Sequence, residues 1–184
     1  MVLQLFDETP LHRDNFIKLA EEGYYDSLLF HRVIREFMIQ GGDPDSRNAA
    51  KGKQLGQGGP GYTVPAEFVD SLIHRKGALA AARTGDMVNP QKASSGSQFY
   101  IVQGRPFTDA ELDNLEMRSG KKYSAEAREM YKTTGGTPHL DGAYTVYGRV
   151  VEGLDVLDAI GQAPTAPGDR PLEDVRIISV KVLK

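Results

Sequence analysis

Residues 30–40, Phe-His-Arg-Val-Ile-Arg-Glu-Phe-Met-Ile-Gln, place a cation among apolar side chains. In a strand, alternation puts Arg32 on the same face as the apolar residues two positions before and after it. A charged group set against apolar neighbours usually has a partner or a function, because desolvating it is costly. Arg32 is therefore a candidate functional residue, and a solvated or ion-paired arginine is the alternative. Met38 and Gln40 share a face further along, with Phe37 opposite unless a bulge re-aims it.

Two later stretches are also informative. Residues 96–103, Gly-Ser-Gln-Phe-Tyr-Ile-Val-Gln, place Gln98 and Tyr100 on one side of a strand at i, i+2. Residues 139–148, His-Leu-Asp-Gly-Ala-Tyr-Thr-Val-Tyr-Gly, predict a turn followed by a strand. These residues are candidates to contact the same ligand as Arg32 only if the fold brings the three stretches together.

Several classes of chemistry are not expected. The chain has no cysteine, which excludes disulfides, thiolate metal sites and cysteine nucleophiles. Its histidines, His12, His31, His74 and His139, lack the short spacing of a metal cluster. Residues 56–61 match G-x-G-x-x-G, but a polar loop precedes them and no helix start follows, so nucleotide binding is not expected. There is no G-x-S-x-G elbow, although spacing alone leaves a Ser/His/Asp triad open.

The composition is that of an ordinary globular protein with 184 residues, 40% hydrophobic residues and a net charge of −3. Charges of both signs are interspersed, so no nucleic-acid partner is expected. No apolar run approaches the roughly 20 residues of a membrane-spanning helix. The length predicts one domain over residues 1–184. The first residues of the chain alternate between apolar and polar as in a strand, and they lack the features of a signal peptide. The sequence as given therefore favours a cytoplasmic location.

The elements that position these residues are mostly strands separated by glycine-rich or polar loops, as in a barrel or sandwich. The predicted strands are Met1–Phe6, Leu29–Ile34, Phe37–Gln40, Ala78–Ala82, Gln98–Gln103, Thr145–Val151 and Val175–Leu183. One helix is predicted from the N-cap Thr9 and Pro10 to about Gly23, and another over Leu154–Ile160 with Gly161 at its end. Both helices are expected to cover the ends of the strand assembly.

Residues 105–137 differ in character and predict a helical hairpin inserted between two strands. Thr108-Asp109-Ala110-Glu111 is a capping box at the start of one charged helix. A second helical stretch runs from Ser124 to about Lys132. The hairpin is expected to be either a solvated insert or a site that recruits a partner or extends a groove.

Four ordered blocks together resemble the cyclophilin family of peptidyl-prolyl cis–trans isomerases. They are FHRVIREFMIQGGDP, GALAAARTG, SSGSQFYIV and LDGAYTVYGRVVEG. The resemblance covers nearly the whole chain apart from 105–137 and is greatest to bacterial members. It implies a closed antiparallel eight-stranded barrel with a helix over each end, plus the helical insert. It also implies a shallow groove for Xaa-Pro peptides, no cofactor and a monomer.

The resemblance also implies roles for individual residues. Arg32 matches the catalytic arginine of the family. The residues matching its proline pocket, peptide-backbone contacts and strand edge are Phe37, Met38, Gln40, Ala82, Arg83, Gln98, Tyr100 and Leu140. At three site positions the chain departs from frequent family residues: His139 replaces tryptophan, Tyr144 replaces histidine, and Arg83 replaces asparagine. Because His139 lacks an indole N–H donor, weak binding of the family's inhibitor cyclosporin is expected.

The family has another strand before the one that Met1–Phe6 matches. We therefore expect that the sequence is a fragment or begins at an internal methionine. A longer chain could carry a signal peptide or a lipid anchor, which would place the protein in the periplasm or on a membrane.

The function implied by the resemblance is rotation about Xaa-Pro bonds in folding or unfolded proteins. In the twisted transition state, the proline nitrogen regains a lone pair to which Arg32 could donate a hydrogen bond. This reaction needs no nucleophile or metal. The alternative is a non-catalytic proline-peptide-binding or chaperone module on the same scaffold.

Overall fold

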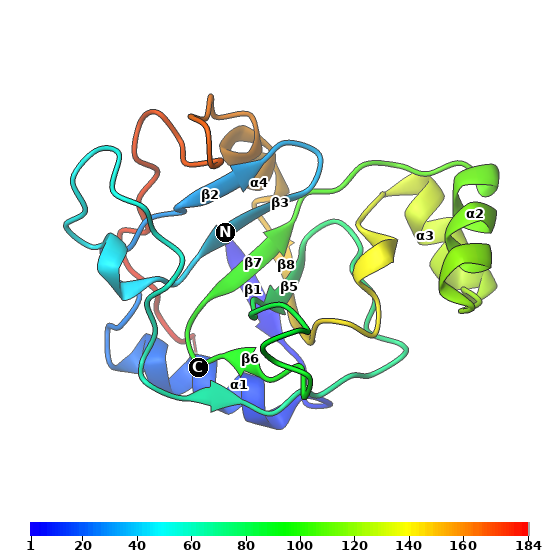
Figure 1. Ribbon diagram of the computed structural model, residues 1–184, viewed down its shortest axis with the longest axis horizontal. Helices are drawn as coiled ribbons and strands as arrows, with labels where there is room; N and C mark the ends of the chain where they lie inside the picture. Colours follow the sequence, from blue (N-terminus) through cyan, green and yellow to red (C-terminus); the bar gives the residue numbers. More distant parts are fainter. Residues whose placement is uncertain (184) are drawn as a thin grey trace.

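A computed structural model describes residues 1–183 and contains one main antiparallel sheet (Figure 1). Its strands are β1 (Val2–Leu5), β2 (Arg32–Ile34), β3 (Met38–Gly41), β5 (Ala78–Ala81), β7 (Phe99–Val102) and β8 (Val146–Glu152). They are hydrogen-bonded in the order β1-β8-β5-β7-β3-β2. Two further short strands, β4 (Thr63–Val64) and β6 (Ser94–Ser95), pair with each other in a separate ribbon.

Six of the seven predicted strands are present with bounds shifted by a few residues, whereas the strand predicted over Val175–Leu183 is wrong. Its first residues do pair with the segment before β2, since Phe30 N donates to Val175 O and Ile177 N donates to Leu28 O. Beyond Ile177 the pairing stops, and Val180 N donates to the Asp26 carboxylate instead. Alternating apolar residues therefore make a strand here only as far as a partner strand lies alongside.

The predicted closed barrel of eight strands also differs from what is observed. The main sheet has six strands and its hydrogen-bonded order ends at β1 and β2. The second sheet is made of two-residue strands, which are too short to give a period-two signal in the sequence. The eight strands that the structure describes within residues 1–183 are therefore divided between two sheets, and they do not form a closed barrel.

The two predicted covering helices are confirmed as α1 (Pro10–Glu21) and α4 (Leu154–Gly161), which lie near opposite ends of the strands in Figure 1. Thr9 occupies the N-cap position of α1, but its hydroxyl makes no capping hydrogen bond. The carboxylate of Glu67 serves instead and accepts from Leu11 N at 3.1 Å and His12 N at 3.0 Å. A carboxylate there also suits the positive end of the helix dipole.

Two helices occupy the segment 105–137, α2 (Asp109–Ser119) and α3 (Ala125–Thr133), and lie to one side of the sheet in Figure 1. The predicted capping box is present, because Thr108 and Glu111 exchange the two capping hydrogen bonds. The side chain of Arg128 on α3 donates to Asp113 at 2.8 Å and to Glu116 at 3.2 Å, both on α2. That this segment is an insertion within a family fold stays a prediction, as does the single domain. Two short 3-10 turns are η1 (Pro44–Ser46) and η2 (Pro138–Leu140).

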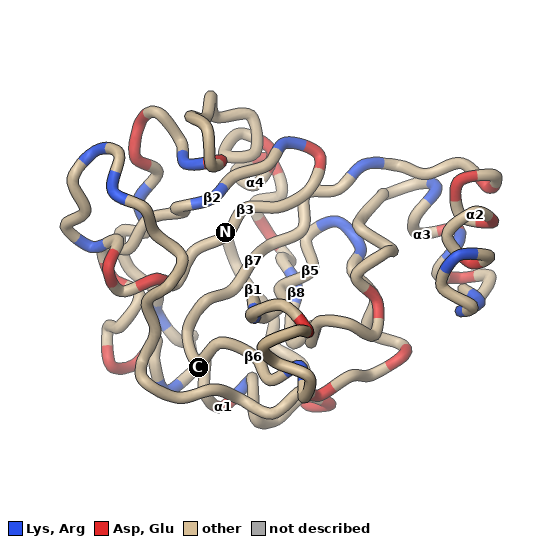
Figure 2. Tube along the Cα trace, viewed as in Figure 1, with Lys and Arg blue, Asp and Glu red and all other residues tan. Residues whose placement is uncertain are grey.

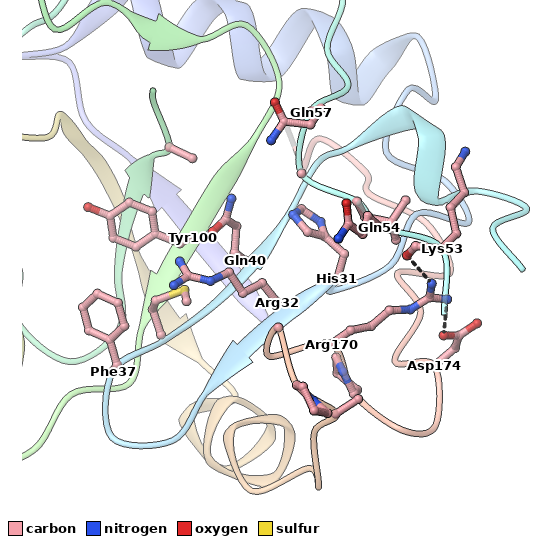
Figure 3. A pocket seen from close by; sticks show the side chains of 18 of the residues that line it. His31, Arg32, Phe37, Gln40, Lys53, Gln54, Gln57, Tyr100, Arg170 and Asp174 are labelled. Carbon is pink, nitrogen blue, oxygen red and sulfur yellow. Dashed lines mark hydrogen bonds and ion pairs between the residues drawn. The ribbon is translucent and has the colours of Figure 1, made fainter. Parts of the chain in front are cut away.

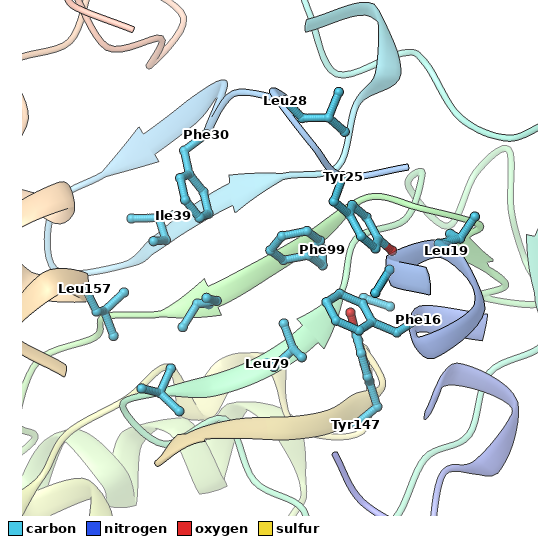
Figure 4. Packing of buried hydrophobic residues seen from close by; sticks show 14 of the residues in the cluster. Phe16, Leu19, Tyr25, Leu28, Phe30, Ile39, Leu79, Phe99, Tyr147 and Leu157 are labelled. Atoms are coloured by element: carbon cyan, nitrogen blue, oxygen red, sulfur yellow. The ribbon is translucent and has the colours of Figure 1, made fainter. Parts of the chain in front are cut away.

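Apolar side chains pack on both faces of the main sheet. On one face, Phe16 of α1 contacts a cluster of aromatic rings (Figure 4), with Tyr25 at 4.9 Å and Phe99 at 5.7 Å between ring centroids. Leu157 of α4 is fully buried in the same cluster. The other face carries Met38 and Tyr100 together with Ala78, Ala80 and Ala82. The first face holds the larger apolar cluster, and the second holds the candidate site. Within residues 1–183, no helix combines the length and apolar character needed to cross a bilayer.

Candidate active site

Cross-strand register sets a row of side chains over the second face of the sheet. Arg32 on β2 is paired with Gln40 on β3, Gln40 with Tyr100 on β7, and Tyr100 with Ala80 on β5. Directly opposed residues share a face and lie about 4.5–5.5 Å apart at Cβ. Stretches far apart in the sequence therefore meet because the strand order places β2, β3, β7 and β5 side by side.

A cavity of about 670 Å³ lies over this row (Figure 3). Nine of the eleven predicted site residues line it: Arg32, Phe37, Met38, Gln40, Ala82, Arg83, Tyr100, Leu140 and Tyr144. The other two, Gln98 and His139, contact its lining rather than the cavity. Segments 51–57 and 166–174 contribute to the far wall, and the sequence had not indicated either of them. We call this space the Arg32 cavity.

A tight turn brings Phe37 onto the same side as Met38. Glu36 has a left-handed backbone with φ of 59°, and its N–H donates to Gln103 Oε1 at 2.7 Å. Phe37 N then donates to Ile34 O at 3.1 Å. This turn is the departure from strict alternation that lets both residues line the cavity. The ring of Phe37 stacks on His139, with 5.7 Å between centroids.

Arg32 is held at one end and free at the other. Its Nε donates to Asp169 Oδ2 at 3.3 Å, and both side chains are about two-fifths exposed. The backbone fixes Asp169, because Val33 N donates to Asp169 O at 2.8 Å. Within residues 1–183, the terminal guanidinium nitrogens of Arg32 have no hydrogen-bond partner. They can therefore donate to a group that enters the cavity.

Arg83 is a different case, because three of its five N–H donors already have partners. Its Nε donates to Ala143 O at 2.8 Å, and its Nη1 donates to Thr84 O at 2.9 Å and to Asp86 Oδ1 at 2.6 Å. The guanidinium lies 4.5 Å from the centroid of the Tyr144 ring. Arg83 thus shapes the edge of the cavity and holds Tyr144, as an arginine stacked on an aromatic face can do.

The amide groups beside the row are also ordered. Gln40 Nε2 donates to Gln98 Oε1 at 3.1 Å, and Gln98 Nε2 donates to Gly58 O at 2.7 Å. Gly58 belongs to the glycine-rich segment 56–61. Its neighbour Gly56 donates through its N–H to the Asp43 carboxylate. The segment thus packs against the site, and the residues that follow it form β4 and not a helix.

The comparisons with known proteins bear on the whole chain. The family model described as cyclophilin type peptidyl-prolyl cis-trans isomerase matches residues 1–182. The chain belongs to this family. A Streptococcus pyogenes protein described as a candidate bifunctional phosphatase/peptidyl-prolyl cis-trans isomerase is 41% identical over 187 residues, covering 99% of the chain but 36% of that protein. A candidate peptidyl-prolyl cis-trans isomerase of Staphylococcus saprophyticus is 36% identical, covering 97% of the chain and 83% of its own length.

Solved structures show the same fold at lower sequence identity. A Cryptosporidium parvum cyclophilin type isomerase, crystallised in the presence of the dipeptide Ala-Pro, superposes with a TM-score of 0.69. It is 23% identical, and the match covers 99% of this chain and 91% of that one. A second structure of that protein gives a TM-score of 0.67 at 24% identity, with 96% and 86% covered.

A buried hydrogen-bonded chain lies behind the cavity of this cyclophilin-type isomerase, and sequence reasoning missed it. The phenol oxygen of Tyr100 lies 3.0 Å from His74 Nε2, and His74 Nδ1 lies 2.8 Å from Asp141 Oδ1. Asp141 Oδ2 accepts from the Tyr131 hydroxyl of α3 at 2.5 Å. A carboxylate only accepts, so in the neutral imidazole Nδ1 carries the proton and Nε2 accepts from Tyr100. Burial raises the pKa of both phenols, so both stay protonated donors.

His31 is another residue for which the sequence alone predicted no role. Its side chain is almost completely buried beside the Arg32 cavity, and neither ring nitrogen has a hydrogen-bond partner among residues 1–183. Burial lowers the pKa of His31 below its usual 6.5. No group of three potential metal ligands occurs within residues 1–183.

Proposed function

We propose that the protein accelerates rotation about Xaa-Pro bonds of polypeptides bound in the Arg32 cavity, with Arg32 as the catalytic residue. Support comes from family membership and from a pair of unpartnered guanidinium nitrogens beside an apolar pocket. The similar Cryptosporidium parvum protein was crystallised in the presence of Ala-Pro, a dipeptide that contains an Xaa-Pro bond, which supports this class of ligand. Folding or unfolded chains that expose proline are the proposed substrates.

The proposed chemistry is stabilisation of a twisted amide. Rotation is slow because resonance gives the C–N bond double-bond character, with a barrier of about 18–20 kcal/mol. When the bond twists, the proline nitrogen regains a lone pair that the planar ground state does not offer. A terminal nitrogen of Arg32 would donate to that lone pair, which is an interaction stronger in the transition state than in the ground state. No bond is made or broken.

The surrounding residues have distinct proposed roles. Phe37, Met38, Tyr100 and Leu140 would hold the proline ring, because their side chains form the apolar part of the cavity. Gln40 and Gln98 would bind the peptide backbone on one side of the rotating bond. The strand edge at Ala82 and Arg83 would align the peptide, so that one half is fixed while the other turns. Tyr144 and His139 would border the pocket.

The experiment is exchange spectroscopy by NMR on a short Xaa-Pro peptide with wild type, Arg32→Ala and Arg35→Ala. Arg35 is an exposed arginine three residues away and serves as the matched control. We expect Arg32→Ala to lower kcat/KM at least about 100-fold, about 2.7 kcal/mol, with the fold intact by circular dichroism. A decrease in kcat/KM of less than about tenfold would show that Arg32 is not the catalytic residue. No acceleration by folded wild type would favour a non-catalytic peptide-binding module.

A further inference from the structure

The glycine-rich segment 56–61 reaches the Arg32 cavity through its backbone. It belongs to a loop whose residues 54–66 carry no charge (Figure 2), so no ion pair of their own fixes them. Gly56 lines the cavity, and Gly58 O accepts the side-chain amide of Gln98 at 2.7 Å. Whatever holds this segment in place therefore also decides how the amide of Gln98 is oriented.

Asp43 is the side chain that holds the glycine-rich segment. It comes two residues after β3 and is completely buried. Its carboxylate accepts from two backbone N–H groups, with Oδ1 bonded to Asp45 N at 2.8 Å and Oδ2 bonded to Gly56 N. A buried carboxylate is costly unless its oxygens are hydrogen-bonded. The need to satisfy Asp43 therefore keeps Gly56, and the chain that follows it, against the site.

Gly58 packs directly on the same carboxylate. A Cβ atom added to Gly58 would overlap Asp43 Oδ1, and this oxygen cannot move aside easily because it is buried and bonded to Asp45 N. The backbone of Gly58 is not left-handed, so glycine is required here for space and not for conformation. The next residue, Gly59, is also not left-handed, and a Cβ atom there would meet no atom within 4 Å. The two adjacent glycines thus differ in whether Asp43 lies against them.

Two side-chain amides carry the orientation from Gly58 into the cavity. A backbone carbonyl oxygen only accepts, so Gln98 must turn its Nε2 towards Gly58 O, and its Oε1 then faces Gln40. Gln40 Nε2 donates to that oxygen at 3.1 Å. Gln40 lies opposite Arg32 in the pairing of β2 with β3. The contact between Gly58 and Gln98 therefore orders an amide directly beside Arg32, and order before binding lowers the cost of binding.

We propose that Asp43 and Gly58 are positioning residues for substrate binding, because Asp43 fixes the glycine-rich segment and Gly58 O orients the amides of Gln98 and Gln40 towards the peptide backbone. This inference rests on the proposed function, which assigns those two amides to the half of the peptide that does not turn. Contacts to that half are equal in the ground state and the transition state. Their loss should therefore raise KM and leave kcat unchanged. Partial unfolding has the opposite signature, since fewer active molecules lower the apparent kcat at constant KM.

The test compares Gly58→Ala with Gly59→Ala in the NMR exchange assay and in a titration with the same Xaa-Pro peptide. We expect Gly58→Ala to raise KM and Kd about three- to tenfold with kcat unchanged, and the matched control Gly59→Ala to bind as wild type does. The side-chain amide resonances of Gln98 and Gln40 should shift in Gly58→Ala and stay in place in Gly59→Ala. The proposal is wrong if the two variants behave alike, or if Gly58→Ala lowers kcat at constant KM.

Asp43→Ala tests the other half of the proposal and should also raise Kd. Because this change removes the oxygen that excludes a Cβ atom at Gly58, adding Gly58→Ala to it should raise Kd less than the same change does in wild type. Strictly additive effects would show that Gly58 does not act with Asp43 and would overturn the proposal. Asp43→Asn keeps the side-chain volume but loses one acceptor, so it should raise Kd as well and covers the case in which Asp43→Ala does not fold.

The same samples report the proposed function separately, because Kd is measured without turnover. Binding of the peptide without acceleration by wild type would contradict the isomerase function and leave the comparison of Gly58→Ala with Gly59→Ala valid. Acceleration by wild type with equal Kd in both glycine variants would contradict only the positioning role. A wild type that does not bind the peptide would contradict both.

Discussion

The imidazole Nε2 of His74, a fully buried residue, lies 3.0 Å from the phenol oxygen of Tyr100, which lines the Arg32 cavity. The contact holds the Tyr100 ring from behind. Because His74 is fixed in turn by Asp141 and Asp141 by Tyr131, the position of one wall of the cavity depends on α3. The helical hairpin is thereby connected to the candidate active site.

Tyr100→Phe tests the energetic value of that contact. The substitution keeps the ring but leaves His74 Nε2 buried without a donor, so we expect a loss of about 1–3 kcal/mol in the free energy of unfolding. Urea denaturation measures it. Tyr144→Phe is the matched control, since the Tyr144 hydroxyl has no hydrogen bond within residues 1–183, and its stability should change little. Equal stability of Tyr100→Phe and wild type would show that solvent or rearrangement replaces the lost bond.

Asp169→Asn tests whether the carboxylate orients Arg32. Asp169 has φ of 67°, a conformation that asparagine tolerates, so the backbone should be preserved. Because the Arg32–Asp169 pair is two-fifths exposed, its contribution is about 1 kcal/mol or less. We expect kcat to fall about two- to fivefold with KM nearly unchanged, since Arg32 would act in the transition state.

The matched control for that experiment is Glu173→Gln, which removes a nearby exposed carboxylate paired with Lys51 at 3.5 Å. It should leave kcat unchanged. If both variants lower kcat/KM equally, the effect is one of net charge and not of Arg32 orientation.

Stability should fall as the pH drops below about 6.5, in part because of His31. Burial lowers the pKa of His31 in the folded state, so the unfolded chain binds a proton first as the pH falls. Since stability rises with pH wherever the unfolded state binds more protons, stability is lost between the unfolded pKa of 6.5 and the lower folded value. Urea titrations at about pH 7.5 and about pH 5.5 measure the difference.

His31→Gln should reduce that pH dependence without abolishing it. The pKa of His12 is also lowered, mainly by burial, while its contact with Glu67 opposes the shift, so His12 remains a second contributor. An unchanged difference between the two pH values in His31→Gln would exclude His31 as a source.

Cyclosporin should inhibit weakly. The family resemblance places His139 where tryptophan is frequent, and His139 stacks on Phe37 without an indole N–H to donate. We expect His139→Trp to strengthen inhibition in the peptide exchange assay, because the exposed position beside Phe37 can accept a larger ring. Submicromolar inhibition of wild type would contradict the expectation.

Local sequence patterns predicted the parts of the fold that depend on local periodicity. The strands that carry Arg32, Gln40 and Tyr100 follow from alternation, and α1 and α4 follow from helical spacing with their glycine ends. The segment Val175–Leu183 has the same alternation but lacks a partner strand over most of its length, and pairing is a tertiary property. The cap of α1 likewise comes from Glu67, which is distant in the sequence.

Most residues of the candidate site came from the family resemblance, and the structure adds their surroundings. His74 and Asp141 are 67 positions apart, so nothing local to either one indicates that they are bonded. As isolated polar residues they could be considered only as metal ligands or surface groups. Asp169 and Arg32 are 137 positions apart and present the same difficulty. Polar networks of this kind become visible only once the strands are in register.

Leu140 and Asp141 are consecutive residues, yet Leu140 lines the Arg32 cavity and Asp141 is the acceptor shared by His74 and Tyr131. One peptide unit therefore joins the wall of the cavity to the hydrogen bonds that hold α3. A ligand that displaced Leu140 would displace Asp141 with it, so the buried His74 and the Tyr131 hydroxyl would sense occupancy of a cavity that neither of them lines.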